Sequence, residues 1–270
     1  MYTDSHCHLN SAELKENLPA VMQAMKAAQV ERALCICTTL EEFHSVHQLA
    51  LEHANFWCTV GVHPDNEGVQ EASTQVLVEL ASLDKVVGIG ETGLDYFQLG
   101  ERSVADMQWQ RDRFRVHIRA ALISDKPLVI HTRNASKDTL AILKEEGGKA
   151  SERQPVRGVF HCFTETKDVA REALDLGFYI SFSGILTFKT ADDIREVAKF
   201  VPIDRLLIET DSPYLAPMPY RGKTNNPSYV PLIAKQLSLI RPESLEAIAH
   251  ATSQNFDQLF TDVKTSLETV

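Results

Sequence analysis

The sequence predicts one α/β domain, a single (β/α)8 barrel of the TIM type with extra C-terminal helices. Short runs rich in apolar and β-branched residues alternate along the chain with longer segments of helical periodicity. Most of the short runs are apolar at consecutive positions, as is typical of parallel strands buried on both faces. No linker rich in Pro, Gly or Ser divides the chain. This alternation favours a barrel, with an open doubly wound sheet as the alternative.

Eight strands account for the short apolar runs. They are expected at residues 2–4, 32–37, 56–60, 86–89, 128–130, 158–160, 179–182 and 206–208. Seven helices are expected to follow them, because apolar residues recur there at helical spacing with charges opposite. They are expected at 14–28, 41–53, 74–81, 105–123, 135–145, 167–176 and 191–200. Closing helices are expected near 230–239, 243–251 and 254–259, so we assign 1–262 to the barrel and 263–270 to a tail.

The composition excludes several functional classes. The chain has 270 residues, with 37 acidic against 27 basic side chains and a formal charge of −10. Such an acidic protein is not expected to coat duplex DNA or an anionic membrane, although a small basic cleft remains compatible with it. Five cysteines argue against a disulfide framework and for a reducing compartment. We expect a soluble, cytoplasmic monomer with no membrane contact and no obligate protein partner.

Histidines and carboxylates follow the predicted strands at their carboxyl ends. They are His6 and His8 after the first strand, His63 after the third, Glu91 after the fourth, His131 after the fifth, His161 after the sixth and Asp211 after the eighth. In a barrel these positions meet at one rim, which is where such enzymes build their active sites. Any one of these histidines is more readily explained as a core or loop residue, but the whole set is best explained by convergence.

This set of side chains predicts a metal centre. His6 and His8 stand two residues apart in an extended segment, so both imidazoles face the same side. Four histidines and two carboxylates exceed what one zinc ion needs, so we expect two divalent ions, with Zn, Mn or Mg as candidates. Glu91 is the candidate bridge, since its glycine neighbours allow close approach. Asp211 is preferred over Glu209 as a ligand because it lies nearer the rim, and Glu209 is expected to support the ligands from behind or to be a hydrogen-bonded inner residue.

Other side chains near the strand ends are candidates for substrate contacts. Arg133, Arg221 and Lys223 could hold phosphate oxygens, and ordinary solvated loop charge is the alternative. Tyr96, Phe97 and Tyr214 could stack on unpaired bases, and packing at the rim is about equally plausible for them. The glycines of 88–93 match a dinucleotide fingerprint, but no helix is expected to begin there, so we set this match aside.

Seven segments resemble the TatD-type metal-dependent hydrolases of the amidohydrolase-like superfamily. They are Asp-Ser-His-Cys-His-Leu at 4–9, Gly-Val-His-Pro at 61–64, Gly-Glu-Thr-Gly-Leu-Asp-Tyr at 90–96, His-Thr-Arg at 131–133, Phe-His-Cys-Phe-Thr at 160–164, Tyr-Ile-Ser-Phe-Ser-Gly at 179–184 and Glu-Thr-Asp-Ser-Pro-Tyr-Leu at 209–215. They span nearly the whole chain in order. The chain departs from the family pattern at Asn10, Asn134, Tyr220 and Asn226, and none of these is a proposed ligand.

The resemblance implies the ligand sets and an activity. It implies that His6, His8, Glu91 and Asp211 hold one ion, and that Glu91, His131 and His161 hold the other. It also implies deoxyribonuclease activity in some members, often as a 3′-to-5′ exonuclease on single strands. The substrate would then be single-stranded DNA or DNA ends, with His63, Arg133, Arg221 and Lys223 as contacts.

Together these observations predict a hydrolase that cleaves phosphodiester bonds with a hydroxide activated by two metal ions. Glu91 would bridge the ions, and Asp211 would orient the hydroxide and take its proton. The alternative enzyme is a metal-dependent hydrolase of a small ester, lactone or amide. A nucleic-acid-binding factor with a structural metal is disfavoured, because structural zinc sites are closed and need no second ion.

Overall fold

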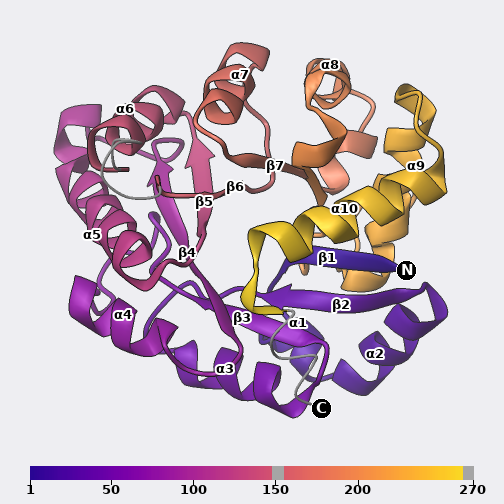
Figure 1. Ribbon diagram of the computed structural model, residues 1–270, viewed down its shortest axis with the longest axis horizontal. Helices are drawn as coiled ribbons and strands as arrows, with labels where there is room; N and C mark the ends of the chain where they lie inside the picture. Colours follow the sequence, from indigo (N-terminus) through magenta and orange to yellow (C-terminus); the bar gives the residue numbers. More distant parts are fainter. Residues whose placement is uncertain (148–154, 264–270) are drawn as a thin grey trace.

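A computed structural model describes residues 1–147 and 155–263, and within them eight parallel strands form one sheet in sequential order (Figure 1). The strands are β1 (Tyr2–Cys7), β2 (Val30–Cys35), β3 (Phe56–Val60), β4 (Val86–Asp95), β5 (Leu128–Arg133), β6 (Gly158–Phe160), β7 (Tyr179–Phe182) and β8 (Leu206–Ile208). Every neighbouring pair is parallel. The sheet is a nearly closed (β/α)8 barrel, as the sequence predicts.

The seam between β1 and β8 is closed just beyond the end of β8. The backbone amide of Asp211 donates to the carbonyl of His6 at 2.9 Å, and the amide of His8 donates to the carbonyl of Ser212 at 2.8 Å. These two hydrogen bonds join the first and last strands through residues that the sequence marks as metal ligands. Backbone hydrogen bonds therefore join the ends of the first and eighth strands without the help of a metal ion.

Helices surround the strands, as Figure 1 shows. They are α1 (Ala12–Lys15), α2 (Leu18–Ala27), α3 (Phe43–Glu52), α4 (Thr74–Ala81), α5 (Gln108–Ser124), α6 (Ser136–Glu146), α7 (Lys167–Asp175), α8 (Asp192–Phe200), α9 (Val230–Ile240) and α10 (Leu245–Leu259). Short 3-10 turns are η1 (Val104–Met107), η2 (Gly184–Thr187), η3 (Ile203–Arg205) and η4 (Pro227–Tyr229). No described helix is long and apolar enough to cross a membrane.

The barrel interior is an apolar cluster that α10 and the residues after it complete. Strand side chains such as Trp57, Val129 and Leu207 share this cluster with Phe256 and Phe260. Because α10 packs against β1 and β8, its Phe256 and the following Phe260 close one end of the interior. Bulk water is thus excluded beneath the polar end of the barrel.

Several observed boundaries differ from the predicted ones: β1 and β5 each run three residues further, and β2 begins and ends two residues earlier. Three larger differences have clear causes. The helix expected at 14–28 is two helices, because Pro19 lacks an amide donor and stands in the first turn of α2 instead of a helix interior. The strand expected at 86–89 continues to Asp95. The helices expected at 243–251 and 254–259 are one helix, in which the Thr252 hydroxyl bonds the Ile248 carbonyl at 2.9 Å. Residues 264–270 of the expected tail lie outside the described part.

Candidate metal centre

Glu91 occupies the middle of the polar end of the barrel because glycines let two strands approach there. A Cβ on Gly61 would lie 2.5 Å from the Gly90 carbonyl carbon, and a Cβ on Gly90 would lie 2.7 Å from the Val129 carbonyl oxygen. Gly90 also has φ 153°, which side-chain-bearing residues rarely adopt. Glycine at both positions therefore allows β4 to carry Glu91 between its neighbours.

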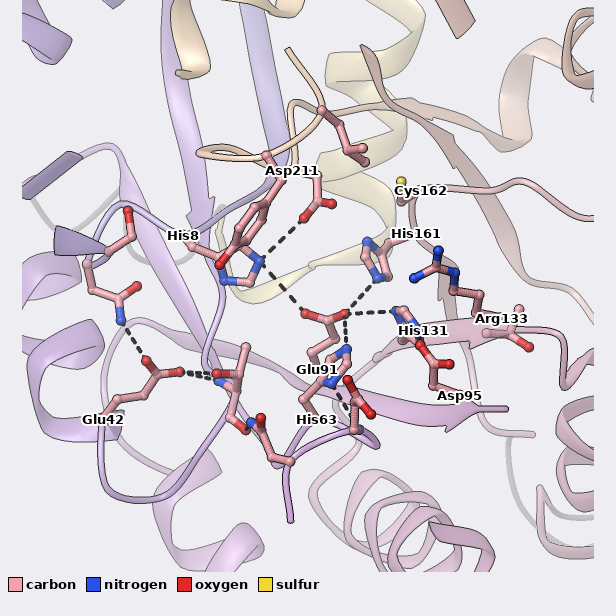
Figure 2. A pocket seen from close by; sticks show the side chains of 18 of the residues that line it. His8, Glu42, His63, Glu91, Asp95, His131, Arg133, His161, Cys162 and Asp211 are labelled. Carbon is pink, nitrogen blue, oxygen red and sulfur yellow. Dashed lines mark hydrogen bonds and ion pairs between the residues drawn. The ribbon is translucent and has the colours of Figure 1, made fainter. Parts of the chain in front are cut away.

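The two oxygens of Glu91 face two different groups of histidines (Figure 2). Oε2 lies 3.4 Å from His6 Nε2 and 3.9 Å from His8 Nε2. Oε1 lies 2.8 Å from His161 Nε2 and 3.3 Å from His131 Nδ1. One carboxylate thus reaches both groups.

The first group is completed by Asp211. Its Oδ1 lies 3.5 Å from His6 Nε2 and 3.4 Å from His8 Nε2, and these two nitrogens are 3.3 Å apart. Nitrogen and oxygen atoms of this kind gather at such distances around a cation, which supplies the positive charge that they share. This donor set fits a divalent metal ion.

In the second group, His131 and His161 are held by carboxylates behind them. His131 Nε2 lies 2.9 Å from Asp95 Oδ2, and His161 Nδ1 lies 3.2 Å from Glu209 Oε1. An ionised carboxylate only accepts hydrogen bonds, so each of these ring nitrogens carries a proton. In the neutral ring the other nitrogen then has a free lone pair, and it points at Glu91. Both histidines are therefore oriented as metal ligands.

His63 lies beside the second group with the opposite orientation. Its Nε2 is 3.3 Å from Glu91 Oε1, so it joins His131 and Glu91 in one cluster of candidate ligand atoms. However, its Nδ1 accepts a hydrogen bond from the backbone amide of Asp65 at 3.1 Å. In the neutral ring the proton is therefore on Nε2, which makes His63 a donor toward the pocket.

Charged neighbours shift the pKa values of the central side chains in the direction opposite to the effect of burial. Burial alone would raise the pKa of Glu91, but the nearby imidazoles of His161, His63 and His6 hold that pKa well below its usual range. Burial would likewise lower the pKa of His161, but Glu91 and Glu209 raise it well above the usual value. Without an ion, these side chains stabilise each other as charged pairs. A divalent ion would replace the protons on the ligating imidazoles.

A cavity of about 900 Å³ opens over this centre. Arg133 lines it, and the guanidinium carbon of Arg133 lies 3.5 Å from the ring centre of Phe97. Tyr214 also lines the cavity and is 61% exposed. Of the two roles expected for Tyr96, the structure agrees with packing and not with stacking, because Tyr96 is buried and its hydroxyl donates to Asp138 at 2.9 Å. Arg221 and Lys223 are exposed and are not among the lining residues.

Two functional contacts were not predicted from the sequence. Asp95, which orients His131, has a readable signal, because it stands four residues after Glu91 on the same face of β4. Glu42 lines the cavity from the segment after β2 and accepts hydrogen bonds from Asn10 and Thr38. No histidine marks that strand end, so the sequence contains no comparable signal for Glu42.

Comparison with known proteins identifies the family. The model of the family described as TatD related DNase matches residues 3–261. The chain belongs to the TatD family. It is 42% identical over 260 residues to the uncharacterized metal-dependent hydrolase YcfH of Escherichia coli, a match that covers 95% of this chain and 94% of YcfH.

Two further relatives extend the comparison. The 3'-5' ssDNA/RNA exonuclease TatD of Citrobacter rodentium is 33% identical over 263 residues, covering 95% of this chain and 97% of that protein. The crystal structure of the TatD homolog YjjV of Escherichia coli superposes with a TM-score of 0.86 at 25% identity, covering 96% of this chain and 98% of YjjV. This TatD-family chain is therefore a metal-dependent hydrolase with the (β/α)8 fold.

Proposed function

We propose that this TatD-family hydrolase cleaves phosphodiester bonds of single-stranded DNA from its 3′ end. The observation that carries the proposal is the position of Glu91, whose two oxygens face two separate sets of ligand atoms. A carboxylate between two ions is a recurring feature of enzymes that displace phosphate oxygens. The relative named a 3'-5' ssDNA/RNA exonuclease supports the choice of substrate.

Each set of side chains would hold one ion. His6, His8 and Asp211 with Glu91 Oε2 form the first set. His131 and His161 with Glu91 Oε1 form the second. Two bound divalent ions would supply the charge that lowers the pKa of an attacking water and offsets negative charge on the phosphate.

The remaining side chains of the cavity position the reactants. Asp211 stands at the cavity wall with its side chain 15% exposed, so it orients the attacking water and accepts its proton. His63 donates from Nε2 to a phosphate oxygen, because its Nδ1 is already an acceptor. Arg133, which lines the cavity and forms no ion pair with a described carboxylate, binds a second phosphate oxygen.

The cavity favours a single strand over a duplex. Tyr214 exposes its ring at the cavity, and Phe97 is exposed beside the cavity-lining Arg133; bases that are not paired can stack on such rings. The formal charge of −10 repels a long duplex, whereas a chain end needs only the mouth of the cavity.

The test is hydrolysis of end-labelled single-stranded DNA by protein loaded with Mn or Mg, compared with Glu91→Gln. We expect the wild type to shorten the strand from its 3′ end, and the variant to lose at least about a thousandfold in rate because both ions lose a shared ligand. The matched control is Glu79→Gln, on an exposed position of α4, which should keep wild-type activity. Hydrolysis of small esters or amides with DNA left intact would contradict the proposal.

A further inference from the structure

Two loops beside the cavity pack together into one surface. The loop after β7 contacts the loop after β8, because the Met218 amide donates to the Thr187 hydroxyl at 2.8 Å. A Cβ on Gly184 would lie only 2.0 Å from the Leu215 carbonyl oxygen, so glycine allows this close approach. Ile185 and Leu215, one from each loop, both line the cavity. The paired loops are therefore continuous with the mouth of the cavity.

Beyond the cavity these loops carry cations without acidic partners. Lys189, Arg221 and Lys223 are exposed, and none of them forms an ion pair with a described carboxylate. The chain has ten more acidic than basic side chains, and most arginines elsewhere in the described residues are paired with Asp or Glu. Arg221 is thus unusual among the described arginines, whereas most described lysines form no ion pair. What distinguishes this surface is that three unpaired cations stand on two loops that pack together, where their charge attracts anions.

Aromatic rings hold two of these cations in place. The Arg221 guanidinium carbon lies 4.4 Å from the ring centre of Phe188, and the Lys223 ammonium lies 6.0 Å from that of Tyr220. Tyr220 in turn stacks on Tyr229, with ring centres 4.3 Å apart and planes within 4°. A carboxylate would orient a cation and also neutralise it, whereas an aromatic ring orients it and leaves its charge available. Cations alternating with aromatic rings are typical of surfaces that bind single-stranded nucleic acid.

These cations do not act at the reacting phosphate. Arg221 and Lys223 do not line the cavity over Glu91, whereas Arg133 does. We propose that the surface formed by Phe188, Lys189, Tyr220, Arg221 and Lys223, the β7–β8 rim, binds the sugar–phosphate backbone of a single-stranded nucleic acid upstream of the bond that is cleaved. This assignment rests on the proposed function, and it predicts a preference for long strands over short ones.

The test measures binding separately from cleavage. A fluorescent single strand of about 20 nucleotides with phosphorothioate linkages, which resist hydrolysis, is titrated with wild type and with the double variant Arg221→Ala/Lys223→Ala over a series of salt concentrations. We expect Kd to rise about tenfold and the salt dependence of log Kd to become shallower by about 1.4, since two phosphate contacts are lost. The control double variant Lys26→Ala/Lys199→Ala removes the same charge from the ends of α2 and α8 and should stay within about twofold of wild type.

Cleavage of a long and a short substrate then shows whether the lost contacts lie outside the cavity. For the rim variant, we expect KM to rise several-fold more for a cleavable strand of about 20 nucleotides than for a dinucleotide, because the dinucleotide does not reach the rim. Wild-type Kd and salt dependence in the rim variant, an equal loss in the control, or an equal rise in KM for both substrates would overturn the inference. A wild type that binds the strand and never cleaves it would instead contradict the proposed function and leave the rim assignment supported.

Discussion

Carboxylates behind the histidines decide what each ring of the metal centre can do. Asp95 and Glu209 accept hydrogen bonds from His131 and His161, whereas the Asp65 amide donates one to His63. The three rings lie around the same Glu91 oxygen, yet in their neutral forms two present lone pairs to it and one presents a proton. A single hydrogen bond at the far nitrogen of each ring thus makes His131 and His161 candidate metal ligands and His63 a candidate donor to the substrate.

Asp95→Asn tests this distinction. An asparagine can present an amide donor to His131, which favours the wrong ring tautomer, so we expect metal affinity to fall between about 10-fold and 100-fold with the fold intact. Isothermal titration with Zn or Mn measures the metal affinity, and circular dichroism checks that the fold is intact. The control is Asp138→Asn, whose carboxylate accepts from Tyr96 and does not line the cavity. Equal affinities for both variants and the wild type would show that Asp95 does not orient His131.

The sequence predicted where the reactive side chains meet, but not how their rings are turned. Positions after the strands were sufficient to bring His6, Glu91 and Asp211 together, because strand order and the fold determine those ends. Ring orientation depends on contacts between residues far apart in sequence, such as that of Glu209 with His161. The sequence can therefore indicate Glu209 as a supporting residue, but not which ring it contacts.

At the scale of elements, α5 supports the loop that presents His63. The guanidinium of Arg113 donates to the His63 carbonyl at 2.7 Å and forms an ion pair with Glu71. One turn later, His117 Nε2 accepts from the Val62 amide at 2.9 Å, while its Nδ1 donates to the Arg113 carbonyl at 2.8 Å. His117 is therefore a neutral bridge between α5 and the end of β3.

His117 makes the fold sensitive to acid. Burial lowers its pKa to about 4, so the folded protein keeps the ring neutral while the unfolded chain takes up a proton near the ordinary value. Stability contributed by the neutral ring is complete above about pH 6.5 and is lost as pH falls toward 4, by up to about 3 kcal/mol. Urea unfolding of wild type and His117→Gln from pH 7 to pH 4 should show a smaller loss in the variant. Parallel profiles for the two proteins would refute this assignment.

Element boundaries were predictable where one apolar run fills one strand. The predicted strands at 56–60, 158–160, 179–182 and 206–208 are confirmed, as is the helix at 74–81. The strand that carries Glu91 was predicted too short, because Gly90 and Gly93 are poor strand formers and continue β4 only through contacts with β5. The glycines that allow close approach at the metal centre therefore make the second half of β4 hard to recognise from the sequence.

At the scale of the whole molecule, the metal centre joins strands that are distant in sequence. Its candidate ligands come from β1, β4, β5 and the ends of β6 and β8, and the seam near His6 and Asp211 has two backbone hydrogen bonds. The formal charge of −10 counts Glu91 and Asp211 as acidic, although bound divalent ions would offset them locally. Metal binding is consequently linked to the folded arrangement of these distant strands.

This linkage predicts that metal stabilises the entire fold. An ion that binds only the folded chain adds about 2.7 kcal/mol to the free energy of unfolding at a concentration of a hundred times its Kd. Wild type with Zn or Mn should therefore unfold at higher denaturant concentration than wild type with a chelator, as followed by circular dichroism. In Asp211→Asn the difference should shrink, because Asp211 lies 3.5 Å or less from both His6 and His8 in the first group. A wild-type midpoint that chelation leaves unchanged would contradict stabilisation of the folded chain by the ion.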